Sequence, residues 1–168
     1  MKYLIVVDMQ NDFITGSLGT PHAVAIVPAV VDLVKNFDGK VVFTRDTHGE
    51  GYLETAEGRK LPVAHCIKGS AGWQICPELA PYVNFVIDKP SFGSLALPEF
   101  IKSFGEEISG IELCGLCTDI CVISNAMILK AAFPEVPISV NSSCSAGVTP
   151  ESHNTALDAM RAVQIDIV

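Results

Sequence analysis

The chain has 168 residues, of which 49% are hydrophobic and 18% charged, and its formal net charge is -8 at pH 7. This composition predicts a single globular domain, residues 1–168, and is too apolar for a disordered chain. The negative charge is not concentrated in an acidic block, and it disfavours nucleic acids and anionic membranes as partners.

The first half of the chain alternates short apolar runs with segments of helical periodicity. Short β-branched runs indicate buried strands, and valines three or four residues apart indicate an amphipathic helix. We expect strands over residues 3–7, 40–44 and 84–87, helices over residues 23–37 and 73–79, and a polar loop over residues 49–72. A loop of that length in a compact domain is usually functional or disordered.

The second half continues the alternation. We expect helices over residues 97–104, 118–132 and 150–163, and strands over residues 108–116, 138–141 and 164–168. Thr118 is the expected N-cap of its helix, and Thr149-Pro150-Glu151 has the cap, proline and acidic residue of a helix start. The alternation predicts an α/β fold, a three-layer αβα sandwich with a mostly parallel sheet of roughly six strands.

Polar residues follow four of these strands at their carboxyl ends, where ligands bind in open parallel sheets. Asp8 follows the first strand, Asp46 and His48 follow the second, and Lys89 follows the third. Cys121 lies just past the fourth. Each of these residues taken alone is explained as a strand-end or surface residue. Their convergence on one edge of the sheet favours a reactive site.

Cys121 is the candidate nucleophile of this set. It follows a sharp strand-to-helix turn at Gly115 and lies in the first helical turn, where free amides and the helix dipole favour a thiolate. Asp8 can accept the thiol proton and return it to a leaving amine. Lys89 can hold both groups and stabilise the thiolate by its charge. The alternative is that Cys121 is a small buried apolar residue.

Residues after the second strand offer ligands for a divalent transition metal. Asp46, His48 and His65 supply oxygen and nitrogen donors, and Glu57 or Glu54 can supply a fourth position. Zinc fits such ligands, as do manganese and iron. The alternative is that both histidines are ordinary loop residues.

Together these residues resemble a known family. The motifs that carry the resemblance are Asp8-x-Gln10-x-Asp12-Phe13, Asp46-x-His48, Pro62-x-x-His65-Cys66, Lys89, Gly115-x-x-Thr118-Asp119-x-Cys121-Val122 and Ala146-Gly147-Val148. They are similar to the motifs of the nicotinamidase branch of the isochorismatase-like cysteine hydrolases, over nearly the whole chain. The resemblance implies an amidase that converts a small amide, with nicotinamide the leading candidate, to a carboxylic acid and ammonia through a thioester.

The resemblance also implies roles for individual residues. It implies a catalytic triad of Asp8, Lys89 and Cys121. It implies an oxyanion hole formed by the backbone N–H groups of Cys117 and Cys121. It further implies a cis peptide bond between Leu116 and Cys117.

For the metal, the resemblance implies ligation by Asp46, His48 and His65. Some nicotinamidases have a further histidine between the last two, and this chain has none there. Others have a glutamate, for which we expect Glu57, because it lies closer to His65, with Glu54 as the alternative.

Aromatic residues are the expected walls of the substrate pocket. The resemblance implies that Phe13 forms one wall. The family's second aromatic wall, three residues before the metal-binding histidine, is Pro62 in this chain. Trp73 and Phe92 are the candidates that replace it.

Three other functions remain open at this point. One is a related hydrolase that cleaves a carbamoyl or ureido compound without a metal. The second is a non-catalytic binding protein on the same fold. The third is a thiol redox protein that uses Cys114 and Cys117.

The cysteine content and one helix bear on location and assembly. The chain has six cysteines, and its N-terminal apolar run is too short for a signal peptide. We therefore predict a cytoplasmic protein with reduced cysteines. The expected helix over residues 118–132 is apolar on nearly all sides, which predicts that it is covered on both sides within the domain or that part of it contacts another subunit. With the resemblance, this indicates a homo-oligomer, either a dimer or a tetramer.

Overall fold

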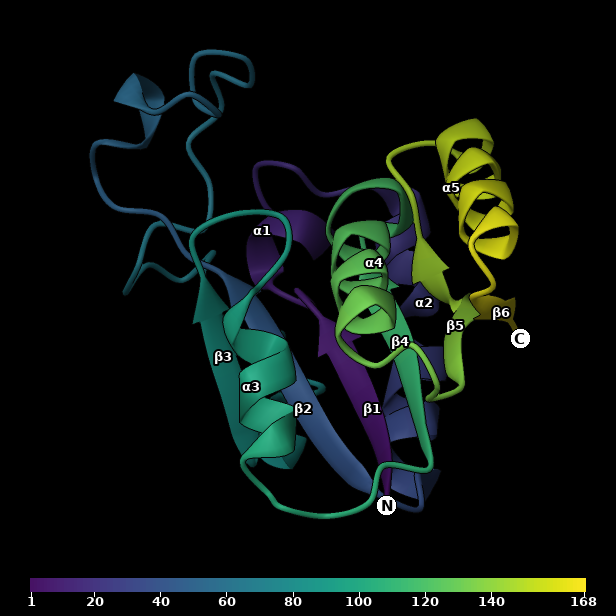
Figure 1. The fold of residues 1–168 in the computed structure, drawn as a ribbon. Helices are drawn as coiled ribbons and strands as arrows, with labels where there is room; N and C mark the ends of the chain where they lie inside the picture. Colours follow the sequence, from purple (N-terminus) through teal and green to yellow (C-terminus); the bar gives the residue numbers. More distant parts are fainter.

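The computed structural model describes residues 1–168 and is built around one six-stranded sheet (Figure 1). The strands are β1 (Lys2–Val7), β2 (Lys40–Asp46), β3 (Phe85–Lys89), β4 (Gly110–Leu116), β5 (Ile138–Ala146) and β6 (Asp166–Ile167). Their order is β3-β2-β1-β4-β5-β6, and every neighbouring pair is parallel. The carboxyl end of β1 therefore lies between those of β2 and β4.

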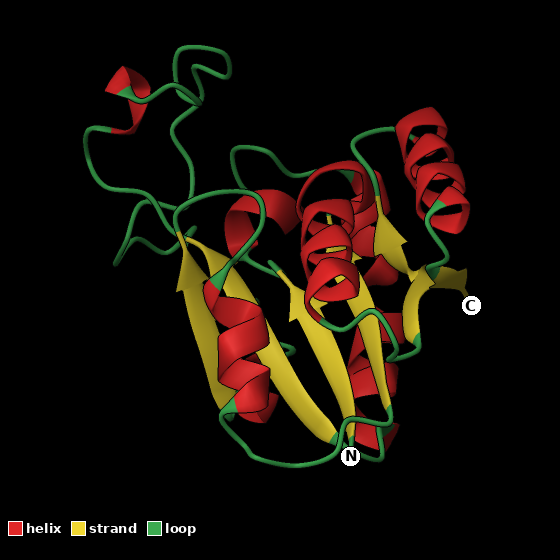
Figure 2. Cartoon of the chain, viewed as in Figure 1, coloured by secondary structure: helices red, strands yellow, loops and turns green.

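Helices cover both faces of this sheet and form the expected three layers (Figure 2). The helices are α1 (Asn11–Ile14), α2 (Pro21–Asn36), α3 (Ala96–Lys102), α4 (Ile123–Ala132) and α5 (Pro150–Ala162). One core packs α2 against the sheet, and a second core packs α3, α4 and α5 against the opposite face. No helix combines the length and apolar character needed to cross a lipid bilayer.

Strand β1 is buried on both faces because it lies between these two helical layers. Alternate side chains of a strand point to opposite faces. Leu4 and Val6 accordingly join the core that contains α2. Tyr3, Ile5 and Val7 join the core that contains α3, α4 and α5, and all five residues are fully buried. This double burial explains why the strand is a continuous apolar run in the sequence.

The helix expected over residues 73–79 is absent, so that prediction was wrong. Ile75 instead forms an antiparallel bridge with Gln10, in the segment that follows β1. This pairing uses backbone groups that a helix would need for its own hydrogen bonds. A single 3₁₀ turn follows at Ala80–Tyr82, and the short helix α1 is an element that the sequence did not suggest.

Two further elements near the carboxyl edge differ from expectation. The helix expected from Thr118 begins with a π-helical turn, Thr118–Val122, before α4. Strand β5 continues past Asn141 to Ala146, because its pairing with β4 resumes after a register shift.

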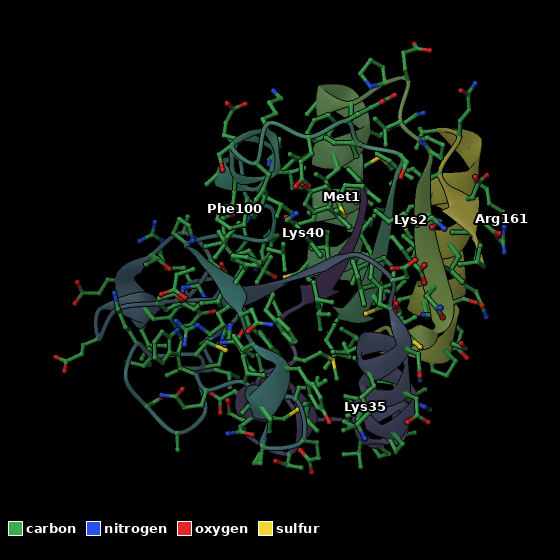
Figure 3. All side chains as sticks on the ribbon, turned by 90° about the horizontal axis from the view of Figure 1, so that it is seen from below. Met1, Lys2, Lys35, Lys40, Phe100 and Arg161 are labelled. Atoms are coloured by element: carbon green, nitrogen blue, oxygen red, sulfur yellow. The ribbon has the colours of Figure 1, made fainter.

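The two ends of the sheet differ in character. The long loop after β2 projects from the carboxyl edge and contains one 3₁₀ turn, Tyr52–Glu54 (Figure 1). Met1, Lys2 and Lys40 lie at the opposite end of the molecule, which Figure 3 views from below. The polar residues that follow the strands therefore share their end of the sheet with the long loop.

Candidate active site

The adjacent ends of β1, β2 and β3 present three of the residues singled out in the sequence. Asp46 and Lys89 are the last residues of β2 and β3 and face each other in the ladder. Asp8 follows β1 directly, with φ of 48°, in the left-handed region that aspartate tolerates better than most residues. Its N–H donates to the Thr44 carbonyl of β2 at 3.2 Å. The backbone thus fixes all three residues at one edge.

The Lys89 ammonium contacts both other members of the expected triad. Its Nζ is 2.6 Å from Asp8 Oδ2 and 3.4 Å from Cys121 Sγ, and it donates to the Ser91 carbonyl at 3.0 Å. Asp8 and Lys89 are fully buried, and Cys121 is 5% exposed. Three side chains that are far apart in the sequence therefore form one buried cluster.

Burial and neighbouring charges both shift the pKa values of Asp8 and Lys89. Burial raises the pKa of Asp8, and Lys89 opposes that rise. Asp46 raises it further, while a 2.6 Å hydrogen bond from Thr44 Oγ1 lowers it. Burial alone would lower the pKa of Lys89, but the carboxylates of Asp8 and Asp46 raise it above its ordinary value. Lys89 is therefore an ammonium at neutral pH.

The electrostatics of Cys121 differ from the sequence-based expectation of a stabilised thiolate. Burial, followed by the charge of Asp8, raises the pKa of this thiol well above its ordinary value, although Lys89 acts against the rise. Desolvation outweighs the favourable helix end and the ammonium. The resting sulfur is therefore a neutral thiol, and its reaction as a nucleophile requires a base such as Asp8.

The turn between β4 and α4 sets the geometry around Cys121. Gly115 has φ of 114°, and a Cβ there would lie 2.1 Å from the Val7 carbonyl oxygen, so only glycine fits. The Leu116–Cys117 peptide bond is cis, as the resemblance implies. The N–H of Cys117 has no acceptor within the protein, and Cys117 lines the same pocket as Cys121. A backbone donor without an internal partner thus lies at this turn.

Thr118 does not cap the helix, contrary to the sequence-based prediction. Cys117 occupies the N-cap position without a side-chain cap. The fully buried Thr118 instead pairs its Oγ1 with Nδ1 of His153 at 2.8 Å. The hydroxyl is used to tie the turn to α5, which the local sequence could not indicate.

Asn125 is a polar residue of the site that sequence reasoning missed. It is fully buried in α4, and its Nδ2 donates to the carbonyls of Cys121 at 2.8 Å and Phe92 at 3.2 Å. Its Oδ1 accepts from the Ser94 N–H at 3.0 Å. The amide thereby joins the turn that carries Cys121 to the loop after β3. An asparagine within an apolar helical run is the signal that could have revealed it.

A second cluster of polar side chains lies beside the first. Asp46, His48, Glu57 and His65 each offer a ligand atom, and these atoms all lie within 4.8 Å of one another. His48 Nε2 is 2.8 Å and His65 Nε2 is 3.3 Å from Asp46 Oδ2. Glu57 Oε1 is 3.7 Å from both histidine nitrogens. Of the two glutamates considered from the sequence, Glu57 therefore joins the cluster and Glu54 does not.

This donor set suits a divalent transition metal. Two imidazole nitrogens and two carboxylates are ligands that zinc, manganese and iron accept. His65 Nδ1 pairs with the Val63 carbonyl at 2.8 Å, which leaves Nε2 directed at the cluster. Although burial alone would raise the pKa of Asp46, hydrogen bonds from His48 and His65 and the charge of Lys89 hold it below its usual range. Asp46 is therefore ionised, as a metal ligand must be.

Two side chains after β1 brace this cluster. The buried Gln10 accepts from the Asp46 N–H and donates to the Asp46 carbonyl, both at 2.8 Å. Asp12 Oδ2 accepts from the N–H of Cys66 at 2.7 Å, next to His65. Both residues belong to a motif that carries the family resemblance, but their spacing in the sequence did not indicate which backbone groups they bind.

A cavity of about 210 Å³ connects the two clusters. Asp46, Glu57 and His65 contribute to its lining, as do Cys117 and Cys121. The other lining residues are Phe13, Leu18, Thr20, Leu61, Phe92, Ile120 and Val148. The pocket is therefore mainly apolar, with polar atoms from the two clusters.

Of the three aromatic residues expected to form the walls of the pocket, two line it in the structure. Phe13 and Phe92 line the cavity, but Trp73 does not, so its assignment as a pocket wall was wrong. Its Nε1 donates to Thr47 Oγ1 at 2.8 Å, and the Arg45 guanidinium lies 3.7 Å from the centre of its ring. These contacts hold the indole beside β2, outside the pocket.

Comparison with known proteins agrees with this architecture. The family model for the isochorismatase domain matches residues 2–168. An uncharacterised isochorismatase family protein PncA of Bacillus subtilis is 30% identical over 172 residues, 93% of this chain and 92% of that protein. The nicotinamidase/pyrazinamidase of Mycobacterium tuberculosis is 26% identical over 185 residues, 100% of this chain and 98% of that protein.

The fold is also similar to that of a solved structure. The pyrazinamidase of Pyrococcus horikoshii, in complex with zinc, superposes with a TM-score of 0.86 and is 26% identical, covering 99% of this chain and 98% of that one. Both the match of the family model and the fold extend over nearly the whole chain. The protein therefore belongs to the isochorismatase-domain family.

Proposed function

We propose that this protein is a cysteine amidohydrolase that converts nicotinamide to nicotinate and ammonia. The observation that carries the proposal is the contact of the Lys89 ammonium with both Asp8 and Cys121, at a pocket that also meets Asp46 and His65. The relatives named as nicotinamidase and pyrazinamidase support the choice of an aromatic amide. The mainly apolar lining of the pocket suits such a ring.

In the first half of the proposed reaction, the Cys121 sulfur attacks the amide carbon. Asp8 accepts the thiol proton, and the adjacent Lys89 ammonium favours the ionised form of its carboxylate. Negative charge develops on the carbonyl oxygen, and the N–H groups of Cys117 and Cys121 stabilise it. Asp8 then gives its proton to the nitrogen as the carbon–nitrogen bond breaks, which releases ammonia and leaves a thioester.

In the second half, water attacks the thioester carbon and Asp8 accepts a proton from it. The carbon–sulfur bond breaks, nicotinic acid is released, and Cys121 takes the proton back from Asp8. Lys89 stabilises the sulfur while it carries negative charge, since its Nζ lies 3.4 Å away. Each group thus returns to its starting protonation state.

We also propose that Asp46, His48, Glu57 and His65 bind a divalent cation, most simply zinc. A zinc complex of the Pyrococcus relative supports this choice of metal. Bound there, the cation would supply a Lewis acid toward a ring nitrogen of the substrate. Coordination of the same cation would also hold the loop residues Glu57 and His65 against Asp46 at the end of β2.

The proposed activity predicts a specific pattern in a screen of small amides and ureides for ammonia release. Nicotinamide should be the fastest substrate, and dialysis against a chelator should reduce its hydrolysis, because a cation held by Asp46, His48, Glu57 and His65 would supply a Lewis acid for the substrate ring. Coupled detection of ammonia measures the rates. Preferred cleavage of a carbamoyl or ureido compound, unaffected by the chelator, would instead support the metal-independent alternative.

The two glutamates of the loop provide a matched test of the metal ligands. Glu57→Ala should weaken zinc binding by at least about 100-fold, since loss of a ligand exceeds the usual effect of losing an outer-shell partner. Glu54→Ala should leave zinc affinity within about threefold of the original protein, because Glu54 lies outside the cluster. Competition with a colour-changing chelator measures both constants. Equal effects of the two variants would contradict the assignment of Glu57.

We further propose a cytoplasmic location and a dimer or tetramer. All six cysteines are free, which suits a reducing compartment. Several apolar side chains of α4, including Ile123, Met127 and Ile128, are only partly buried, which leaves room for contact with a second copy.

A further inference from the structure

We propose that Tyr52 is a positioning residue that sets the geometry of the metal-binding histidines. The inference rests on the metal site proposed above. Tyr52 lies in the 3₁₀ turn Tyr52–Glu54 of the long loop, between the exposed residues Gly51 and Leu53. Leu53 is 53% exposed, whereas Tyr52 is 1% exposed. A single ring from a solvent-exposed turn is therefore inserted into the protein.

The Tyr52 ring is packed against both histidines. Its centroid is 4.6 Å from that of His48 and 4.9 Å from that of His65, and the two histidine rings are 4.9 Å apart. The three rings thus form a compact group with tilted or edge-on contacts, the geometry that aromatic pairs prefer. Rotation of either imidazole would require displacement of the phenol ring.

These contacts matter because the two histidines come from opposite ends of the loop. Backbone pairing closes the base of the loop: the His48 N–H donates to the Cys66 carbonyl at 3.0 Å, and the Lys68 N–H donates to the His48 carbonyl at 2.9 Å. These bonds fix the main chain. The Val63 carbonyl also orients the His65 ring through Nδ1, at 2.8 Å, but no backbone hydrogen bond orients the His48 ring. Tyr52 adds a side-chain contact that both imidazole rings share.

The same residue is connected to the rest of the metal and substrate site. The Tyr52 hydroxyl donates to the carbonyl of Leu61, a residue of the pocket wall, at 3.0 Å. The Tyr52 carbonyl accepts from Thr55 Oγ1 at 2.7 Å, and Thr55 Oγ1 accepts from the Gly58 N–H at 2.9 Å, next to Glu57. Tyr52 therefore contacts two proposed ligands directly and the segment of the third through one residue.

Zinc binding to the metal-free protein tests this role separately from activity. Tyr52→Leu should raise the zinc dissociation constant by about 10–100-fold, the usual effect of losing a group that orients metal ligands. Tyr52→Phe keeps the ring and should stay within about threefold of the original protein. In the cobalt-substituted protein, Tyr52→Leu should also shift the visible absorption bands, because the imidazoles can then change their orientation. Tyr52→Met fills more of the space and carries the same prediction if Tyr52→Leu does not fold.

Tyr3→Leu is the matched control, because Tyr3 is another fully buried tyrosine but lies at the amino end of β1 beside Lys2 (Figure 3). It should leave the zinc dissociation constant and the cobalt spectrum unchanged. If folded Tyr52→Leu binds zinc as tightly as the original protein with the same cobalt spectrum, Tyr52 has no positioning role. If Tyr52→Phe loses as much affinity as Tyr52→Leu, the ring contacts are not responsible and the inference also fails. Failure of the unaltered protein to bind zinc would overturn the proposed metal site instead.

Discussion

Cys121→Ala is expected to lower the rate of ammonia release from nicotinamide by at least about 10⁴-fold, because it removes the sulfur that contacts Lys89 and forms the proposed thioester. The fold should persist, since the change removes one sulfur atom from a small side chain. Steady-state ammonia release measures the rate, and circular dichroism with thermal unfolding measures the fold. The acyl group of the thioester intermediate should be absent from the variant in mass spectrometry after quenching, whereas the original protein should carry it on Cys121.

Cys144→Ala provides the control for this experiment. Cys144 is also a buried cysteine, 5% exposed, but it lies in β5 and does not line the pocket. The same chemical change there should leave the rate within a few-fold of the original. Substantial activity in Cys121→Ala, or equal losses in the two variants, would show that the sulfur of Cys121 is not the nucleophile.

The proximity of the candidate catalytic residues was predictable because it depends mainly on the topology of the sheet. Strands that alternate with helices are parallel, and parallel strands place their carboxyl ends at one edge. Asp8, Asp46 and Lys89 follow three such strands, so their proximity followed from the chain order alone. Asn125 was overlooked because the apolar periodicity of its helix obscured a buried amide that pairs with residues about 30 positions away.

Predictions failed where tertiary contacts override local sequence. Residues 73–79 have no helix because Ile75 pairs with Gln10, more than 60 residues earlier. Trp73 was assigned to the pocket for its ring, but its contacts with Thr47 and Arg45 turn it away. The preference for Glu57 over Glu54, by contrast, agrees with the cluster in the structure, although loops have no periodicity from which to infer side-chain direction.

The thiol of Cys121 illustrates a different kind of failure. The helix start and Lys89 both favour a thiolate, and both are visible in the sequence. The extent of burial is not, and desolvation is the largest influence on this group. A sequence therefore reveals the charges near a nucleophile more readily than the solvent that the fold removes from it.

Lys89→Met is expected to destabilise the metal-free protein by about 3–5 kcal/mol near neutral pH, since it leaves Asp8 buried without its ion-pair partner. Without the ammonium, burial and Asp46 raise the pKa of Asp8 against only the hydrogen bond from Thr44. The folded state then binds more protons than the unfolded state above the ordinary aspartate pKa, so stability falls as pH rises through that window. The loss should accordingly be smaller near about pH 4 than near about pH 7, which urea denaturation at the two pH values measures.

Lys102→Met is the control that separates loss of the buried ion pair from loss of a lysine charge in general. Lys102 is also paired with a carboxylate, Glu99, at 2.9 Å, but its side chain is 48% exposed. Exposed pairs of this kind contribute about 0–1 kcal/mol, so this variant should differ little from the original at either pH. A Lys89→Met protein as stable as Lys102→Met would mean that Asp8 does not depend on the ammonium. The proposed reaction would then lose its explanation for an ionised base in a buried site, because no other cation contacts that carboxylate.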